Sequence, residues 1–193
     1  MSSGPKVAFP GEELGTTEEY IPGEGTYEED GRIFSSLVGD VICDHDNLTI
    51  SVRSKNPPVV LQKGDHVITR VIGLYESMVL VEVLMVDGNE RAIAGGDTTA
   101  TIHVSKIDRK YTDDVSKEYR RGDIVRAEVI QSSPSIELVT NYPHLGVIRG
   151  LCVRCRFPLV RKGKDLECSN CSHRETRKLA DDFGNVRFTR RGE

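Results

Sequence analysis

Four cysteines near the C-terminal end of this 193-residue sequence form two matched pairs. Cys152 and Cys155 enclose one two-residue spacer, and Cys168 and Cys171 enclose another after twelve intervening residues. Each Cys-x-x-Cys turn offers two thiolates, and two such turns supply the four soft ligands of a tetrahedral zinc site. Because four thiolates leave no position open for water or substrate, we predict one structural Zn²⁺ per chain. Two disulfides or a redox-active dithiol are the alternatives for this spacing.

A fifth cysteine, Cys43, lies in an apolar run with Val41 and Ile42, and we expect it to be a buried thiol. An unpaired cysteine beside a zinc-type cluster fits a reducing compartment. The sequence has no run approaching the roughly 20 apolar residues of a membrane span. Its first residues also lack the basic and apolar regions of a signal peptide. We therefore expect a cytoplasmic protein with no membrane partner.

The net charge of −4 is unevenly distributed along the chain. Residues 1–30 contain eight acidic residues and one lysine, which gives a net charge of −7. Residues 149–193 contain twelve basic and six acidic residues, which gives a net charge of +6. Such a separation suggests different partners at the two ends. The alternative for the basic end is a solvated surface, because so small a domain has little interior.

The first block, residues 1–58, is rich in glycine and proline, and turns separate its short apolar runs. Such runs have the length of strands, so we predict a small N-terminal β domain. Pro57 and Pro58 end the block, because paired prolines cannot continue a strand ladder. The predicted strands contain residues 33–34, 37–38, 41–42 and 48–52.

The second block, residues 60–148, contains five strand-like runs and a helical segment over residues 112–119. Asp113 and Asp114 suit the N-terminus of that helix. Five strands with a short helix before the fourth match the partly open barrel of the OB-fold. The predicted strands are residues 66–72, 78–86, 100–104, 124–130 and 136–139.

The third block, residues 149–193, contains the four paired cysteines. It is too small for apolar burial alone to stabilise it, so the metal must contribute. The predicted fold is therefore all-β, with an N-terminal β domain, a central OB-fold barrel and a C-terminal zinc ribbon. The predicted ribbon strands are residues 159–160, 166–167, 176–179 and 186–189.

The middle block resembles an S1-type RNA-binding domain in three segments, Gly64–Val67, Ile102–Ile107 and Gly122–Val129. The second segment contains a His-x-Ser element at the end of a predicted strand. The head, with Pro10-Gly11-Glu12, and the four-cysteine ribbon extend the likeness over essentially the whole chain. The sequence is similar to archaeal exosome RNA-binding cap subunits of the Csl-four type.

This resemblance implies a non-catalytic RNA-binding subunit. Such subunits form a trimeric cap, with other cap subunits, on a ring of RNase-PH-like subunits that degrades RNA from its 3′ end. The head would dock the ring, and the cap would recruit single-stranded RNA for degradation and processing. The family is also associated with a DnaG-like primase homologue. An accessory factor of transcription or translation is the alternative, because those machines also use S1 barrels and zinc ribbons.

The candidate RNA contacts depart from the S1 pattern in one respect. S1 domains usually place aromatic residues on the second and third strands, whereas the second strand here reads Met78-Val79-Leu80-Val81. Tyr75 precedes that strand and could supply a stacking ring; partial burial at the barrel rim is the alternative. A polar strand end and a solvated loop are the alternatives for the other candidates, which are His103, Lys106, Arg109 and Lys110.

The sequence contains no recognisable catalytic constellation, so we predict that the chain is not an enzyme. Its adjacent acidic pairs, 113–114 and 181–182, do not suggest a two-metal site, because neighbours on a strand point to opposite faces. It has neither a phosphate-binding glycine loop with its lysine nor a Gly-x-Ser-x-Gly turn. Ser105 lies near His103 but has no third orienting group. An autonomous metal-dependent nuclease, the alternative, would need a carboxylate cluster.

Overall fold

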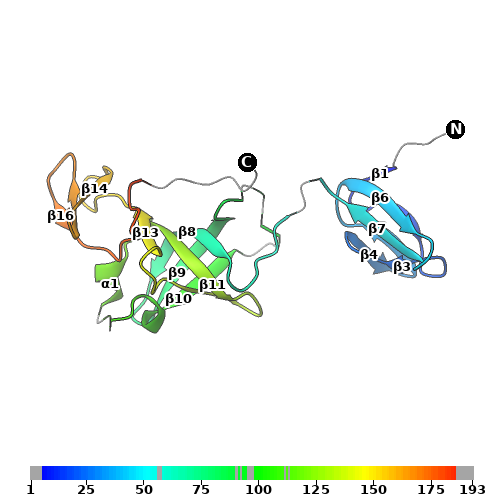
Figure 1. The fold of residues 1–193 in the computed structure, drawn as a ribbon, viewed down its shortest axis with the longest axis horizontal. Coiled ribbons are helices and arrows are strands. Elements are labelled where there is room, and N and C mark those ends of the chain that lie inside the picture. The colour runs from blue at the N-terminus through cyan, green and yellow to red at the C-terminus, as the bar shows by residue number, and fades with distance from the viewer. Residues whose placement is uncertain are drawn as a thin grey trace. The chain divides into compact units, whose positions relative to one another are not determined.

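The structure is a computed structural model of the chain, and it describes residues 6–55, 58–89, 91, 93–94, 98–110, 112 and 114–185. The chain divides into two compact units, Met1–Pro57 and Pro58–Glu193 (Figure 1). Both units consist mainly of β-strands. The second unit contains the barrel and the ribbon, and its further division near residue 148 stays a prediction.

The first unit consists of two small sheets. One has the strand order β1-β6-β7-β3 and the other has the order β2-β5-β4. Ala8, Ile33, Ile50 and Val52 form its buried apolar interior. The strands are β1 (Val7–Ala8), β2 (Glu13–Thr16), β3 (Ile21–Pro22), β4 (Thr26–Glu29), β5 (Arg32–Ser35), β6 (Gly39–Asp44) and β7 (Thr49–Arg53).

Close backbone packing explains one of the glycines of this unit. Gly25 has a φ of +76°, and a Cβ atom there would lie 2.3 Å from the carbonyl oxygen of Val52. Only glycine tolerates both the positive φ and the close approach. Gly25 therefore allows the start of β4 to lie against β7.

Two details of the first unit differ from the sequence prediction. Residues 37–38 lie outside any strand. Cys43 is exposed, so the expectation of a buried thiol is wrong. The cysteine lies near the end of β6, past Gly39 and Asp40, which are the β6 residues paired with β1. Among the described residues, the strand that pairs with β6 at Cys43 is β7.

The second unit contains the predicted OB-fold barrel. Its sheet has the order β12-β10-β9-β8-β11-β13, and an additional pairing of β12 with β11 closes five of these strands into a barrel. β10 and β12 are parallel, as closure of this topology requires. The strands are β8 (His66–Leu74), β9 (Met78–Val86), β10 (Thr99–His103), β11 (Ile124–Gln131), β12 (Ile136–Val139) and β13 (Gly146–Arg149). The five predicted strands are thus confirmed, and β13 is an addition to them.

The segment before β11 closes the barrel with a large side chain. Helix α1 (Val115–Glu118) is shorter than the predicted segment, and the side chain of Asp114 caps it by accepting the N–H of Ser116. Asp113 lies outside the described residues. Tyr119 follows the helix and is fully buried, with its hydroxyl 2.7 Å from Thr140 Oγ1. Burial raises the pKa of this phenol, so the hydroxyl stays protonated, and the ring packs in the apolar core of the barrel.

The ribbon is a three-stranded antiparallel sheet of β14 (Leu159–Lys162), β15 (Asp165–Cys168) and β16 (Arg174–Glu175). It lies at one end of the barrel, beside α1 (orange in Figure 1). Thr176 Oγ1 donates to the Lys117 carbonyl, and the Lys178 N–H donates to the Glu118 carbonyl. The ribbon is therefore tied to the barrel directly after its last strand.

The chain after β16 returns to the barrel as an irregular segment. Leu179 makes only an isolated bridge to Val147 in β13, so the predicted strand at 176–179 is wrong in extent. Gly146 permits this approach, because a Cβ atom there would lie 2.5 Å from the Lys178 carbonyl oxygen. Ala180 and Phe183 are buried, which fixes the segment to the barrel. The predicted strand at 186–189 lies outside the described residues.

Candidate metal centre and nucleic-acid interface

The four paired cysteines converge on one point of the ribbon. Their Sγ atoms all lie within 4.8 Å of one another, and the four side chains could hold a metal ion. Separations of 3.6 Å between Cys152 and Cys171, and 3.3 Å between Cys155 and Cys168, exclude disulfide bonds in this arrangement. All four are free thiols.

The donor set fits a tetrahedral thiolate site. Metal–sulfur bonds of about 2.3 Å in a tetrahedron require sulfur atoms about 3.8 Å apart, close to the separations observed. Backbone N–H groups of the turns point at the sulfurs: Arg154 donates to Cys152, and Cys171 donates to Cys168. The N–H of Phe157 lowers the pKa of the Cys155 thiol to about 6. This favours the thiolate, the metal-binding form, at Cys155, whereas burial raises the pKa of the Cys152 thiol.

The two cysteine turns share a backbone feature that the sequence did not reveal. The residues directly after the second cysteine of each pair, Arg156 and Ser172, have positive φ values of 61° and 55°. These values lie in the left-handed region, which is unfavourable for a residue with a Cβ atom. Both turns therefore adopt the same strained conformation, which brings each pair of sulfurs to the shared centre.

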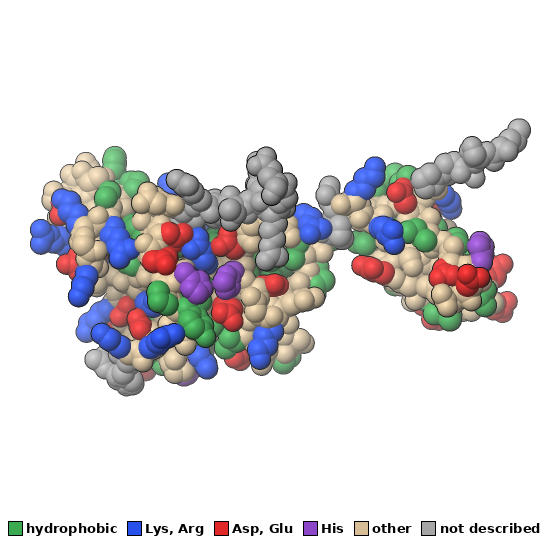
Figure 2. Space-filling view, in the orientation of Figure 1, with side chains coloured by type: hydrophobic (Ala, Val, Ile, Leu, Met, Phe, Trp, Pro, Cys, Tyr) green, Lys and Arg blue, Asp and Glu red, His purple; other side chains and the backbone are tan. Residues whose placement is uncertain are grey.

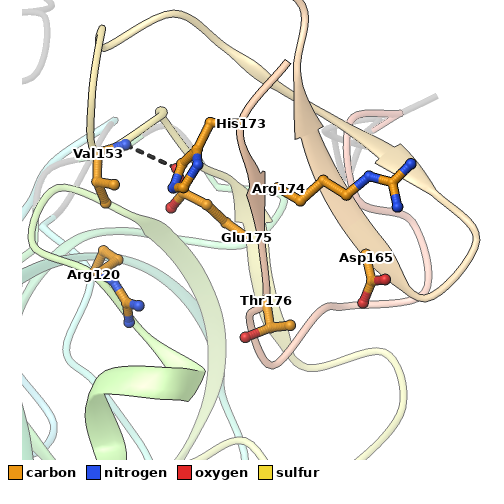
Figure 3. Close-up of a pocket in the computed structure, with 7 residues that line it drawn as sticks. All are labelled: Arg120, Val153, Asp165, His173, Arg174, Glu175 and Thr176. Atoms are coloured by element: carbon orange, nitrogen blue, oxygen red, sulfur yellow. Dashed lines mark hydrogen bonds between the residues drawn. The ribbon is translucent and has the colours of Figure 1, made fainter. Parts of the chain in front are cut away.

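A buried ion network connects the metal centre to the barrel. The Arg177 guanidinium bonds Asp123 at 2.8 Å and Glu175 at 2.7 Å, and all three side chains are at most 3% exposed. The other oxygen of Glu175 accepts the N–H of Val153, inside the first cysteine turn, at 2.9 Å (Figure 3). Asp123 directly precedes β11, the fourth barrel strand. A continuous chain of bonds thus runs from the barrel to the metal centre.

A hollow of about 290 Å³ lies over this network. Figure 3 shows Arg120 and Val153 on one side and Asp165 and Thr176 on the other, with Arg174 directed away from the centre. Arg120 donates to the Tyr119 carbonyl. Glu175 is already bonded twice, and the hollow lies at the seam between barrel and ribbon. Its lining residues are Arg120, Val153, Asp165, His173, Arg174, Glu175 and Thr176.

A second arginine network is also structural. Arg126 is 8% exposed, and its guanidinium bonds both oxygens of Asp182 at 3.0 Å. Its Nε lies 2.9 Å from Asp87. Although burial opposes it, Asp182 and Asp87 hold the pKa of Arg126 above its usual value. Asp182, one half of an acidic pair in the sequence, is therefore a partner of Arg126.

The candidate RNA residues lie around an open groove of about 340 Å³ on the barrel. Strands two and three of an OB-fold, here β9 and β10, form its usual oligonucleotide-binding face. His103 ends β10 and Lys106 lies in η1 (Val104–Lys106), and both line the groove. The other lining residues, none of which the sequence analysis proposed as an RNA contact, are Met78, Thr101, Ser105, Ile130, Glu137 and Leu138.

The remaining candidates surround this groove. Tyr75 is 56% exposed in the turn before β9, and its N–H donates to the Met78 carbonyl. Arg109 and Lys110 line a neighbouring hollow of about 310 Å³ that shares Ser105 with the groove. The structure thus brings all five candidates to neighbouring parts of the barrel surface. Their contact with RNA stays a prediction.

His103 and Ser105 have a local structural role. His103 Nδ1 lies 2.9 Å from Ser105 Oγ and accepts the Ser105 N–H at 3.3 Å, which caps η1. Within the described part of the chain, no carboxylate forms an ion pair with His103. The pair therefore orients the start of the turn that carries Lys106.

A closed OB-fold barrel with a four-cysteine ribbon, preceded by a separate β unit, defines a protein of the S1 and zinc-ribbon class. Residues 7–44 match a family model described as the N-terminal region of exosome complex exonuclease RRP4. The chain is 35% identical over 179 residues to the exosome complex component Csl4 of Archaeoglobus fulgidus, covering 93% of this chain and 97% of that relative. The chain belongs to the Csl4 family of exosome components.

Two further relatives extend this similarity. The chain is 29% identical over 157 residues to the exosome complex component CSL4 of Mus musculus and 28% identical to that of Homo sapiens. Each match covers 77% of this chain and 79% of the relative. The described residues include no helix that is both long and apolar enough to cross a membrane.

Proposed function

We propose that this chain is a non-catalytic RNA-binding cap subunit of the exosome. It recruits single-stranded RNA and guides it to a 3′→5′ exoribonuclease ring built from RNase-PH-like chains. The groove on the barrel, lined by His103 and Lys106, carries the proposal. Membership of the Csl4 family favours the exosome over an accessory factor of transcription or translation.

The first unit is the proposed ring-docking part. It contains the acidic N-terminal region and several exposed apolar side chains, among which Phe9 and Ile21 are each 61% exposed and Leu48 is 55% exposed. Exposed apolar groups beside charged ones suit a protein partner. Other cap subunits, and a DnaG-like primase homologue, are further proposed partners, and the cytoplasm is the proposed location.

The proposed metal is one structural Zn²⁺ held by Cys152, Cys155, Cys168 and Cys171. When bound, it cross-links the two cysteine turns and supplies folding free energy to the ribbon. The thiolate donors and the sulfur separations support zinc as the ion.

Modest RNA affinity per chain suffices for this function. The outward side chains of β9 do not offer aromatic rings, and each stacked base contributes roughly 1–3 kcal/mol. Three copies around one pore compensate, because linked sites act at effective concentrations that reach about the millimolar range.

Charge removal on the barrel tests this assignment. The change Lys106→Ala, Arg109→Ala and Lys110→Ala should weaken binding of single-stranded RNA and flatten its salt dependence. Loss of three phosphate contacts lowers the log–log slope by about 2, at roughly 0.7 per contact. The matched control changes Lys6, Arg32 and Lys55 in the first unit to alanine. It should leave the RNA affinity nearly unchanged. Equal effects of the two triple changes would refute a defined RNA site on the barrel.

Deletion of residues 1–58 should have the opposite effect. Association with the ring should be lost, while the RNA affinity of the remaining chain is roughly kept. Co-purification with the ring subunits and fluorescence anisotropy with labelled RNA measure the two properties separately. Ring association that survives the deletion but disappears in the Lys106, Arg109 and Lys110 variant would reverse the roles assigned to the two units.

The proposal also requires that the isolated chain does not degrade RNA. Labelled RNA incubated with the chain, with and without divalent metal, should stay intact. Asp182 belongs to one of the two adjacent acidic pairs in the sequence. Both of its carboxylate oxygens accept hydrogen bonds from Arg126, so neither is left free for a metal ion. Turnover that disappears when a residue of this chain is changed would show the proposal to be wrong.

A further inference from the structure

An exposed row of rings lies on the barrel outside the groove, and we call it the ring row. Its members are His66, His144 and Tyr142, with the Arg109 guanidinium at one end. The His66 and His144 ring centroids are 5.3 Å apart, and Tyr142 stacks on His144 at 5.9 Å with an interplanar angle of 20°. The Arg109 guanidinium carbon lies 5.4 Å from the Tyr142 ring centroid. Figure 2 shows histidine side chains next to one another on this face, with apolar side chains beside them.

Two cations, the buried Arg126 and the half-buried Lys178, hold the backbone of the ring row in place. Tyr142 and His144 lie in the connection between β12 and β13. The Lys178 ammonium group donates to the Tyr142 carbonyl, and the Arg126 guanidinium donates to the His144 carbonyl, both at 3.3 Å. The side chains themselves stay accessible, since Tyr142 is 40% exposed and the His66 side chain is 43% exposed. The backbone that carries the rings is thus fixed, while the ring side chains are not buried in the core.

The ring row continues the path of the groove. Ser105 lines both the groove and the neighbouring hollow, and Arg109 lines that hollow and covers Tyr142. Lys110 lines the same hollow, together with Asp108, so two cations and one carboxylate stand where the groove meets the rings. At the far end, Glu128 lies 4.0 Å from His66. The positive end therefore faces the groove, and the acidic residue marks where a phosphate backbone would leave.

Single-stranded nucleic acid needs ring faces as well as cations, because its bases stack on aromatic side chains while basic residues follow the phosphates. Along β9 the residues that alternate with the buried Val79 and Val81 are Met78, Leu80 and Glu82, and none of these has a ring. We propose that the ring row is the base-stacking surface of this barrel for single-stranded RNA. The inference rests on the proposed RNA-binding function. It places the stacking contacts mainly in the β12–β13 connection, whereas an S1 domain usually has them on β9 and β10.

The test uses the full chain, a fluorescently labelled oligoadenylate and the same RNA with 2-aminopurine, whose fluorescence is quenched on stacking. Tyr142→Ala should weaken binding about 5- to 150-fold, the equivalent of one stacked base. Tyr142→Phe should keep both affinity and quenching, because it keeps the ring. The matched control is Tyr27→Ala in the first unit, where Tyr27 is 41% exposed and stacks on Phe34 at 5.6 Å. It should change neither readout.

Each outcome separates the ring row from the broader function. If Tyr142→Ala binds RNA as the unmodified chain does, while removal of the charges at Lys106, Arg109 and Lys110 weakens binding, the ring row is refuted and the proposed function stands. If the unmodified chain does not bind the oligonucleotide, both the ring row and the proposed RNA-binding function are refuted. Equal loss in Tyr142→Phe would assign the effect to the hydroxyl group and overturn stacking.

Two further results would also overturn the ring row. The first is the absence of 2-aminopurine quenching with the unmodified chain, which needs no variant to fold. The second is a Tyr142→Ala variant that keeps RNA affinity but loses association with the ring subunits, which would make this face a protein-binding surface. Far-UV circular dichroism confirms that each variant is folded before affinity is compared.

Discussion

Replacement of Arg177 by methionine should destabilise the barrel as well as the ribbon. The guanidinium lies at 0% side-chain exposure between Asp123, at 1%, and Glu175, at 3%. Its removal leaves two buried carboxylates without their cation. Breaking a buried ion pair by removing one partner costs about 3–5 kcal/mol. That is a large fraction of the roughly 5–15 kcal/mol that stabilises a typical domain.

Urea unfolding of the metal-loaded full chain measures this loss. With a slope of about 2 kcal/mol per molar, the midpoint should fall by roughly 2 M. The control is Arg174→Met on the same sheet, where the side chain is 77% exposed and lies 3.6 Å from Glu167. An exposed pair of this kind contributes about 0–1 kcal/mol, so the control midpoint should barely change.

A triple variant without the buried charges, and amide hydrogen exchange, show which parts of the chain lose stability. Combining Arg177→Met with Asp123→Asn and Glu175→Gln removes both orphaned charges and should recover part of the stability. Amide exchange should rise in β11 of the barrel together with β15 of the ribbon. A loss of unfolding free energy below about 1 kcal/mol, or exchange that rises in the ribbon alone, would refute the idea that this network joins them.

The remaining predictions concern the cysteine turns. Protein purified without added zinc should contain one zinc per chain, and the Cys168→Ser variant should contain none. Metal analysis measures both. A zinc-to-protein ratio near zero in the unmodified chain, or cysteines that form disulfides, would contradict the prediction. Because Cys152 and Cys168 pack in one apolar cluster with barrel residues, loss of the metal should also raise exchange at the barrel end near Asp123. Ser172→Gly should stabilise the metal-loaded chain by about 1 kcal/mol in urea, because the left-handed conformation costs a residue with a Cβ atom roughly 1–2 kcal/mol. Ser169→Gly, at a position without a positive φ, should not stabilise it, and equal gains in both variants would remove the conformational explanation.

The barrel could be predicted well because its signals are local. β9 and β12 begin and end where alternating apolar residues and turns predicted. β13 was not predicted, because a four-residue run gains its strand character only by pairing with β11 and by the return of residues 178–180. Strands β1 to β4 have two to four residues and lie among glycines, prolines and glutamates. Their pairing depends on distant partners, which local patterns do not report.

The candidate site divides in the same way. The metal ligands follow from sequence spacing alone, because each turn is a local structure. The burial of Arg126 and Arg177 could not be predicted, because their partners Asp182 and Asp123 lie 56 and 54 residues away. The ring row was missed for the same reason: Arg109 and Tyr142 meet only when η1 and the β12–β13 connection fold together. A sequence reports how many charges and rings a chain has but not which of them remain accessible.

That distinction changes the interpretation of the basic C-terminal region. A net charge of +6 suggests a surface that follows RNA phosphates. Arg177, however, is bonded to two buried carboxylates, Lys162 to Glu167 at 2.7 Å, and Arg161 to carbonyl oxygens of the returning segment. These cations hold the ribbon together and fix it to the barrel. Part of the positive charge of the ribbon is thus used inside the fold, while Arg154, Arg156 and Lys164 stay exposed. In our proposal the groove and the ring row of the barrel carry the RNA contacts.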